Sequence, residues 1–211
     1  MTLWGSVATA ASAPTVLVLG DSLSAAYGIA QDRGWVALLQ RRLADRGLPH
    51  RIVNASVSGE TTRGGLTRLP RLLDEHRPDL VVIELGANDG LRGISDRVLA
   101  DNLRALVETS KGSGARVLLL GIRLPPNYGA AFNARFDRVF DAVARETQTP
   151  LVPFFLKGVA EDRDLMLPDG LHPAAEAQPT LLDNVWPTLE PLLEATRARN
   201  APLSAPAATS G

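Results

Sequence analysis

Cysteine is absent from this 211-residue sequence, and its absence excludes disulfide bonds, thiolate metal ligands and a cysteine nucleophile. An excess of one charge is also lacking, because 22 basic residues accompany 23 acidic residues and the net charge is −1. Such a chain has no field that would draw it to nucleic acid or to an acidic membrane surface. No apolar run approaches the roughly 18 residues that a membrane-spanning helix needs. We therefore expect neither a nucleic-acid partner nor an integral membrane segment.

The hydrophobic residues, 45% of the chain, are enough to bury one substantial core. We predict one folded domain at residues 14–197. Residues 1–13 are small and apolar and contain Ala8-Thr9-Ala10, the small-x-small pattern of an export cleavage site, but they lack a basic residue. We expect either the remnant of an export signal or a disordered N-terminus there. Residues 198–211 have too little bulky apolar surface to order, which predicts a disordered tail.

Five short apolar runs alternate with segments of helical periodicity. Continuous apolarity, rather than alternation, is typical of strands buried on both faces. Strands that alternate with helices indicate an α/β fold with a doubly wound parallel sheet. The strands are predicted at residues 15–20, 51–54, 80–85, 116–121 and 151–155.

The helical segments carry their own boundary signals. The first is followed by Gly47, typical of a helix C-terminus, and the third begins near Ser95. Pro70 is expected to break the second helix or to start a new turn. The aromatic residues of 132–140 have the spacing of one buried helix face, so we assign them to the core rather than to a cofactor site.

Polar residues follow every predicted strand and therefore converge on one edge of the sheet, where ligands of open α/β sheets bind. Ser22 stands where the first strand stops, and a nucleophile is plausible there. The alternative is that Asp21 or Ser22 only caps a following helix. The other polar segments are residues 54–61, 86–90, 123–128 and 169–173.

A serine hydroxyl needs a neighbouring base, and histidine is the side chain best suited to that task near neutral pH. Of the three histidines, only His172 follows a strand; His50 and His76 precede strands, and we expect both to be solvated loop residues. Asp169 could fold back and accept the second ring N–H of His172. The segment around it is also an ideal Pro-Asp-Gly turn, and both readings can hold.

Acyl transfer also needs donors for the oxygen that becomes negative. The candidates are the backbone N–H groups of Ser22 and Gly59 and the side-chain amide of Asn88. The alternative for Asn88-Asp89-Gly90 is a tight turn with no further role. The sequence contains no cluster of metal ligands, no glycine-rich phosphate loop and no G-x-S-x-G elbow. We therefore expect a serine hydrolase of another type, without a metal or cofactor.

These residues resemble the sequence blocks of the GDSL, or SGNH, serine hydrolases. Gly20-Asp21-Ser22-Leu23 is similar to the first block, Gly59 to the second, Gly86-Ala87-Asn88-Asp89 to the third and Asp169-Gly170-Leu171-His172 to the fifth. The segments at 54–61, 84–93 and 123–129 are similar to those of the bacterial multifunctional thioesterase I, lysophospholipase and arylesterase subgroup. The resemblance covers roughly residues 15 to 195.

The resemblance implies a flavodoxin-like three-layer α/β/α fold with a five-stranded parallel sheet in the order 2-1-3-4-5. It implies a catalytic triad of Ser22, His172 and Asp169, and an oxyanion hole from Ser22, Gly59 and Asn88. It also implies that residues 89–94 form a lid, with Gly90 and Gly93 as hinges. The substrate-binding residues are then expected to be Asp89, Gly90, Leu91, Arg92, Gly93, Ile94, Leu124, Pro125 and Tyr128.

Family members act on acyl-CoA-type thioesters, lysophospholipids and aryl esters, commonly in the periplasm. We expect the same reaction here through a seryl-acyl intermediate, in a monomer that is periplasmic, with the cytoplasm as the alternative location. Ala87 and Glu60 depart conservatively from the subgroup's glycine and aspartate, which affects the expected acyl-chain preference rather than the reaction.

Two other functions are considered. A short-chain esterase acting on carbohydrate or aryl acetyl groups would use the same residues with a small polar pocket. A non-catalytic receiver-like module would use acidic residues after the first and third strands and a lysine after the fifth. Asp21, Asp89 and Lys157 fit that pattern superficially but leave Ser22, Asn88 and His172 unexplained.

Overall fold

The computed structural model describes residues 13–199, so the expectations for both ends of the chain fall almost entirely outside the described residues. A parallel sheet of five strands runs through the molecule in the order β2-β1-β3-β4-β5. The predicted fold class and strand order are therefore confirmed. The strands are β1 (Thr15–Gly20), β2 (Arg51–Asn54), β3 (Leu80–Glu84), β4 (Arg116–Leu120) and β5 (Leu151–Val152).

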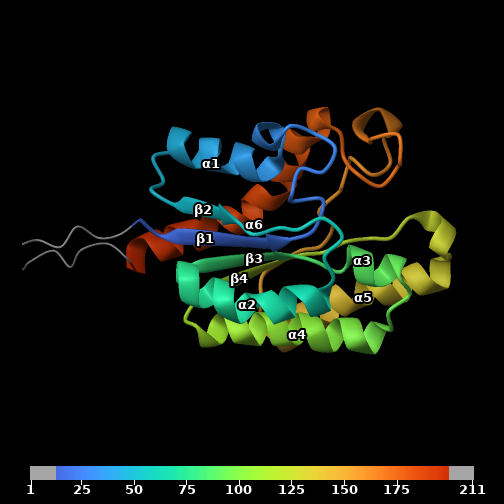
Figure 1. Ribbon diagram of the computed structural model, residues 1–211, viewed down its shortest axis with the longest axis horizontal. Helices are drawn as coiled ribbons and strands as arrows, with labels where there is room; N and C mark the ends of the chain where they lie inside the picture. Colours follow the sequence, from blue (N-terminus) through green and yellow to red (C-terminus); the bar gives the residue numbers. More distant parts are fainter. Residues whose placement is uncertain (1–12, 200–211) are drawn as a thin grey trace, which may run out of the picture.

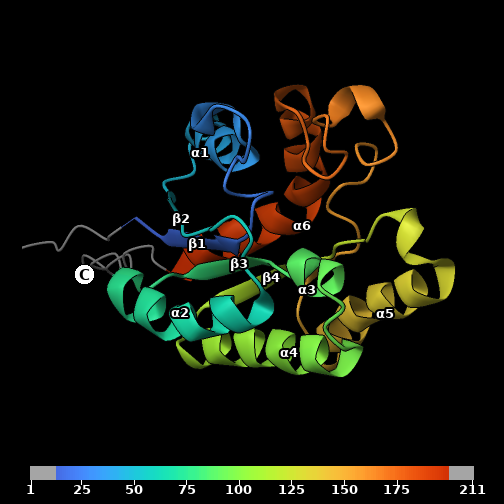
Figure 2. The same cartoon turned by 45° about the vertical axis from the view of Figure 1, so that its right-hand side comes forward.

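The three central strands are apolar without alternation because helices cover both faces of the sheet. Every residue of β1 and β3 is buried, and in β4 only Arg116 is exposed. Helices α1 (Trp35–Asp45) and α6 (Gln178–Arg199) pack on one face (Figure 1). The other face is covered by α2 (Thr62–His76), α4 (Asp96–Gly112) and α5 (Ala130–Glu146), as Figure 2 shows.

Short elements lie among the connecting loops. The five-residue helix α3 (Ala87–Leu91) follows β3 at the carboxyl edge of the sheet. The remaining short turns of helix are Gln31–Arg33, Pro126–Tyr128, Arg163–Leu165 and Ala175–Ala177.

The fifth strand is shorter than predicted, ending at Val152 rather than at residue 155. Pro153 has no N–H to continue the ladder. The chain instead bends across Gly121, whose N–H donates to Val152 O at 2.8 Å and whose carbonyl accepts from Phe155 N at 2.9 Å. A Cβ on Gly121 would lie 2.5 Å from Pro153 O, so this close crossing requires glycine.

Pro70 neither breaks the second helix nor starts a new turn, so that expectation was wrong. α2 runs unbroken from Thr62 to His76. Leu69 and Leu73, on either side of the exposed proline, are buried in the core. Burial of two leucines is worth several kcal/mol, which offsets a proline cost of about 3 kcal/mol.

Helix ends follow the sequence signals. Ser95 caps α4 by accepting a hydrogen bond from Val98 N, as expected. Gly47, just beyond α1, has a φ of 64°, a left-handed conformation that favours glycine. Thr61 caps α2 by accepting from Gly64 N, and this cap fixes the end of the loop that carries Gly59.

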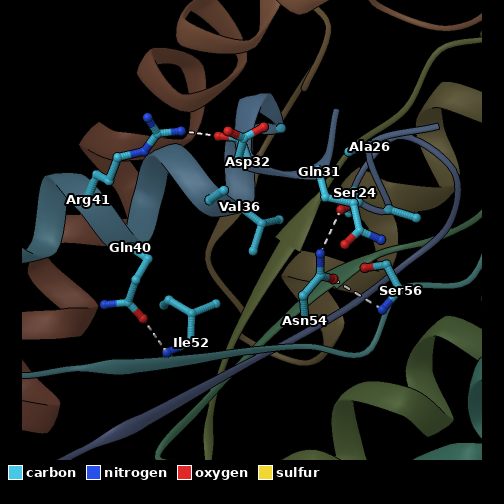
Figure 3. Close-up of a pocket in the computed structure, with 13 residues that line it drawn as sticks. Ser24, Ala26, Gln31, Asp32, Val36, Gln40, Arg41, Ile52, Asn54 and Ser56 are labelled. Atoms are coloured by element: carbon cyan, nitrogen blue, oxygen red, sulfur yellow. Dashed lines mark hydrogen bonds between the residues drawn. The ribbon is translucent and has the colours of Figure 1, made fainter. Parts of the chain in front are cut away.

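The outer edge of the sheet, β2, is covered by a side chain. The Gln40 amide oxygen of α1 accepts from Ile52 N at 2.9 Å (Figure 3). The Gln40 amide nitrogen donates to His50 O at 3.2 Å, so this side chain bonds the edge as a further strand would. At the end of β2, the Asn54 side chain donates from Nδ2 to Ser24 O at 2.8 Å. The groove between α1 and β2 has a volume of about 640 Å³ and a mixed polar and apolar lining. Satisfied edge groups of this kind discourage pairing with a second chain.

Candidate active site

Three side chains far apart in the sequence meet at the carboxyl edge of the sheet. His172 Nε2 lies 2.9 Å from Ser22 Oγ, although 150 positions separate the two residues. His172 Nδ1 lies 2.7 Å from Asp169 Oδ2. The loop after β1 and the long segment between β5 and α6 thus come together at the side of the sheet where α3 also lies (Figure 1). The structure therefore brings His172 within hydrogen-bonding distance of both other predicted triad residues.

The partners of the imidazole determine its tautomer. A carboxylate can only accept, so Nδ1 carries the proton and donates it to Asp169. Nε2 of the neutral ring is then free to accept from the Ser22 hydroxyl. Tyr27 packs against the same imidazole, with ring centroids 4.4 Å apart. The bond to Asp169 at its edge and the Tyr27 ring against its face therefore hold the imidazole in place.

The Asp169 carboxylate is itself fixed by the backbone. Its Oδ1 accepts from Leu171 N at 2.9 Å and from His172 N at 3.0 Å. Partial burial acts to raise the pKa of Asp169, but these bonds and the His172 ring outweigh it and lower the pKa to about 2. Gly170 turns the chain with a φ of 65°. The turn and the orientation of His172 therefore coexist, as the sequence allowed.

The segment after β1 is not the start of a helix, so the capping alternative for Asp21 and Ser22 was wrong. Residues 22–28 form consecutive turns, and α1 begins only at Trp35. Asp21 Oδ1 accepts from Leu23 N at 3.0 Å, which makes a local Asx-turn. This turn leaves Ser22 half-buried at the end of the strand.

The three predicted oxyanion donors lie on neighbouring loops that the Asn88 amide connects. Within residues 13–199 neither Ser22 N nor Gly59 N has a hydrogen-bond acceptor. The Asn88 amide bridges their two loops, because Nδ2 donates at 3.0 Å both to Asp21 Oδ2 and to Glu60 O. Gly59 has a φ of 78°, which disfavours any other residue.

Asn88 and Asp89 lie in α3 rather than in a tight turn, so the turn alternative was wrong. Asp89 is fully buried and accepts from Thr62 N at 2.9 Å and from Thr62 Oγ1 at 2.5 Å. Asn102 donates in turn to Thr62 Oγ1. Asp89 therefore ties α3 to the first residue of α2, which Asn102 of α4 also contacts.

A cavity of about 470 Å³ opens beside Ser22, Asn88 and His172. Its wall is mainly apolar and comes from α3, the loop after β4 and the segment after β5. Three members of the predicted substrate-binding set, Leu91, Leu124 and Pro125, line it. The other predicted members of that set are not in the cavity wall: Asp89, Gly90, Arg92, Gly93, Ile94 and Tyr128.

Sequence reasoning missed several wall residues because each looks like an ordinary core residue in the sequence. The additional apolar wall residues are Ile122, Phe154, Leu156, Ala160 and Met166. The available signal was position, since all of them follow β4 or β5 at the carboxyl edge.

The expected lid is partly a rigid helix. Gly90 lies inside α3, and a Cβ there would come within 2.7 Å of Leu124 and Phe136, so its role is close packing rather than hinge motion. Gly93 has a φ of 67° and open space around it. Arg92 ties this segment to the neighbouring loop by donating to Gly59 O at 2.9 Å.

His50 and His76 lie away from Ser22, as expected, but neither is a solvated loop residue. His50 is buried at the start of β2, and its Nε2 lies 3.1 Å from Leu193 O and 2.9 Å from Thr196 Oγ1. His76 is the last residue of α2 and is partly buried. The error for His50 arose because α6, distant in sequence, covers it.

Two fully buried carboxyl groups lie next to Ser22, and sequence reasoning missed one of them. Asp21 N donates to Glu84 Oε2 at 3.2 Å, and each carboxyl group shifts the pKa of the other. Burial raises the pKa of Asp21 to about 6, although bonds from Leu23 and Asn88 oppose the rise. Burial and the charge of Asp21 raise the pKa of Glu84 well above its ordinary value.

The receiver-like alternative does not fit this arrangement. Asp89 faces Thr62 while Asp21 faces Asn88 and Glu84, so the two aspartates are each satisfied separately. Among residues 13–199 no three histidine or acidic side chains are grouped to hold a metal ion.

Comparison with known proteins identifies relatives over most of the chain. The chain is 58% identical over 183 residues to Esterase TesA of Pseudomonas aeruginosa, covering 87% of this chain and 91% of the relative. It is 42% identical over 184 residues to Thioesterase 1/protease 1/lysophospholipase L1 of Escherichia coli, covering 87% of each.

A solved structure shares the fold. The crystal structure of the psychrotrophic esterase EstA from Pseudoalteromonas sp., inhibited by monoethylphosphonate, superposes with a TM-score of 0.81 at 43% identity. The match covers 85% of this chain and 98% of that one. The family model described as the GDSL-like Lipase/Acylhydrolase family matches residues 18–178. On the sequence match and the shared fold, the chain belongs to the GDSL-like lipase/acylhydrolase family.

Proposed function

We propose that this chain is a serine hydrolase that cleaves acyl esters and thioesters, with Ser22 as the nucleophile. The observation that carries the proposal is the hydrogen-bonded series Ser22–His172–Asp169 at the mouth of an apolar cavity. Family membership and the names of the relatives support the same reaction class.

In the first half of the reaction, Ser22 Oγ attacks the acyl carbonyl carbon while His172 Nε2 takes the hydroxyl proton. The Asp169 carboxylate stabilises the imidazolium that forms. The tetrahedral intermediate then collapses, the bond to the alcohol or thiol breaks, and His172 returns the proton to that leaving group. A seryl ester remains on Ser22.

In the second half, a water molecule gives its proton to His172 and its oxygen attacks the acyl carbonyl. Collapse of the second tetrahedral intermediate releases the carboxylic acid and restores the Ser22 hydroxyl. The negative oxygen of both intermediates would be bound by Ser22 N, Gly59 N and the Asn88 amide. Asn88 has both N–H groups in use, so one of its bonds must be shared when the oxyanion forms.

The cavity is the proposed acyl site. Its leucine, isoleucine, phenylalanine and proline walls suit an alkyl or aryl acyl group. This lining favours acyl thioesters, lysophospholipids and aryl esters over the short-chain acetyl esters that would need a small polar pocket. No cofactor takes part in the proposed reaction.

Two experiments test this function. A fluorophosphonate should label the wild type and should fail to label Ser22→Ala, with His76→Ala as a labelled control. Hydrolysis of p-nitrophenyl esters and acyl-CoA thioesters from two to sixteen carbons should favour chains longer than acetyl, because each methylene buried in the cavity is worth at most about 0.8 kcal/mol. A preference for acetyl would instead support the short-chain esterase.

Location and oligomeric state are further parts of the proposal. Within residues 13–199, no helix combines the length and hydropathy needed to cross a bilayer. We propose a periplasmic monomer that acts on small-molecule esters. Cell fractionation of the full chain and its molar mass in solution would test both points.

A further inference from the structure

The buried carboxyl pair Asp21–Glu84 has no place in the reaction written above, although Asp21 adjoins the nucleophile. The sheet brings the two together, because Gly20 pairs with Glu84 in the β1–β3 register. A Cβ on residue 20 would lie 2.8 Å from Glu84 Oε2, so glycine at this position makes room for the glutamate. This close fit places a second carboxyl directly behind the turn that holds Ser22.

Glu84 is bound on one oxygen. Its Oε2 accepts from Asp21 N at 3.2 Å and from Ser24 Oγ at 2.8 Å, and Ser24 Oγ is held by Trp35 Nε1 at 3.1 Å. Its Oε1 is buried and has no donor within the described part of the chain. A buried carboxylate oxygen without a donor is costly, whereas a protonated carboxyl that donates to Asp21 is satisfied.

The charged groups around the pair also favour a protonated Glu84. His172 is the one charged group outside the pair among the main influences on either carboxyl. Glu60, on the loop opposite, directs its carboxylate to Arg68 at 2.7 Å, and Asp89 of α3 is bound to Thr62. Two adjacent buried carboxyl groups without a cation between them retain a proton.

We propose that Glu84 is a positioning residue, which keeps one proton on the Asp21–Glu84 pair so that a single negative charge, on Asp21, holds the Asn88 amide and faces His172. The inference rests on the function proposed for Ser22 and His172. Asp21 Oδ2 binds Asn88 with charge assistance, whereas Glu60 O is a neutral acceptor. The bond to Glu60 O is then the one that yields when Asn88 turns an N–H toward the oxyanion.

The shared proton matters because negative charge near Ser22 has two opposite effects, one on the His172 imidazolium and one on the oxyanion. One negative charge on Asp21 favours the imidazolium that forms on His172 during attack. A second charge on Glu84 would instead repel the oxyanion held by Asn88. Neutral Glu84 therefore fixes the charge behind the nucleophile at one.

Infrared spectroscopy tests the protonation of Glu84 without turnover. The difference spectrum between wild type and Glu84→Gln at pH 8 should contain the C=O stretching band of a protonated carboxylic acid. Glu146→Gln is the matched control, because Glu146 is an exposed carboxylate paired with Arg104. Its difference spectrum should show carboxylate bands only. If Glu84→Gln fails to fold, the wild-type spectrum still decides, since an ionised pair gives no acid band at pH 8.

The pH dependence of kcat/KM tests the positioning role. Glu84→Gln should lower kcat by about threefold and leave the acid midpoint in place, because one neutral donor replaces another. Asp21→Asn should lower kcat by about 10- to 100-fold with a smaller change in KM. Its acid midpoint should also move to lower pH, since the charge that favours protonated His172 is lost.

Three results would overturn the proposal: no acid band at pH 8, an acid midpoint in Glu84→Gln that moves as far as in Asp21→Asn, or an unmoved midpoint in Asp21→Asn. Loss of the acid band with normal labelling of Ser22 would reject the shared proton alone. An unlabelled Ser22 would reject the function on which the inference rests.

Discussion

At the scale of single residues, the proposed reaction depends on the His172 imidazole, which bridges the Ser22 hydroxyl and the Asp169 carboxylate. Ser22→Ala and His172→Ala should each lower kcat by about 10⁴-fold or more, because Ser22 is the proposed nucleophile and His172 its proposed base. Steady-state kinetics on a p-nitrophenyl ester measures the loss, and circular dichroism confirms that the variants fold. Turnover within tenfold of wild type would remove the residue from its assigned role.

Asn88→Ala should be less severe than loss of the triad. It removes one of the three proposed oxyanion donors, so kcat should fall by about 10²- to 10³-fold while KM changes little. Asn133→Ala is a control in the same residue type, because Asn133 caps the loop after β4 by donating to Pro125 O. A loss in Asn133→Ala equal to that in Asn88→Ala would show that amide contacts in general, rather than the oxyanion, set the rate.

His50 should affect stability with pH rather than turnover. Burial lowers the pKa of His50 below its ordinary 6.5, against the opposing effects of Leu193 O, Asp79 and Glu194. The unfolded chain then binds the proton more readily, so the contribution of His50 is present above pH 6.5 and is lost as the pH falls below it. The difference in unfolding free energy between wild type and His50→Gln, measured in denaturant, should shrink from pH 7.5 to pH 5.

The effect of His50 is measured as the difference between wild type and His50→Gln, because Asp21 and Glu84 change the unfolding free energy with pH in the opposite direction. Because the pKa values of Asp21 and Glu84 are raised in the folded protein, these groups stabilise the fold at low pH. That contribution to the unfolding free energy is lost as the pH rises. A difference between wild type and His50→Gln that grows toward pH 5 would contradict a neutral buried His50.

At the scale of secondary-structure elements, α3 links the catalytic edge to the core. Gly90→Ala should destabilise the fold by about 1–3 kcal/mol, because the new methyl group overlaps Leu124 and Phe136. KM should rise as well, since Leu124 lines the cavity. Thermal denaturation and kinetics measure the two effects.

Gly112→Ala in α4 is the matched control. Nothing lies within 4 Å of the added Cβ, so stability should stay constant or rise by up to about 1 kcal/mol. Equal melting temperatures for Gly90→Ala and Gly112→Ala would show that α3 adjusts freely, as a lid would.

Elements could be predicted where local chemistry decides their ends. The apolar runs of β1 and β2 end at Gly20 and Asn54, and the predicted bounds match the observed ones. Pro70 and the end of β5 could not be predicted, because each outcome depends on packing. Leu69 and Leu73 hold α2 against the core across the proline, and Gly121 takes the place of a strand partner beyond Val152.

The candidate site, like the elements, could be predicted only where a local pattern marks the residue. Ser22, His172 and Asn88 were recoverable because each polar residue follows an apolar strand. Glu84 and the cavity wall were not, since a strand-terminal glutamate and residues such as Phe154 have no distinguishing pattern. Only the register of β1 with β3 places Glu84 behind Ser22.

At the scale of the whole molecule, the parallel sheet turns five separate loops into one site. Each strand contributes a loop at the same edge, while α1, α6, α2, α4 and α5 bury the two faces (Figure 2). The fold class followed from periodicity, and the strand order followed from the family resemblance. The dimensions of the cavity depend on how loops from distant segments pack, which no local pattern encodes.

Substrate choice belongs to this scale. We expect the free energy of transition-state binding to improve with acyl length until the 470 Å³ cavity is full, and then to level off. A plot of log kcat/KM against carbon number for p-nitrophenyl esters should rise and reach a plateau. A line that falls steadily from acetyl would mean that the acyl group lies outside the cavity.

The most direct test of the central claim is mass spectrometry of the protein after reaction with a fluorophosphonate. We predict one adduct per chain, on the peptide that contains Ser22, and no adduct in His172→Ala on the same timescale. An adduct on another residue, or undiminished labelling without His172, would contradict the account.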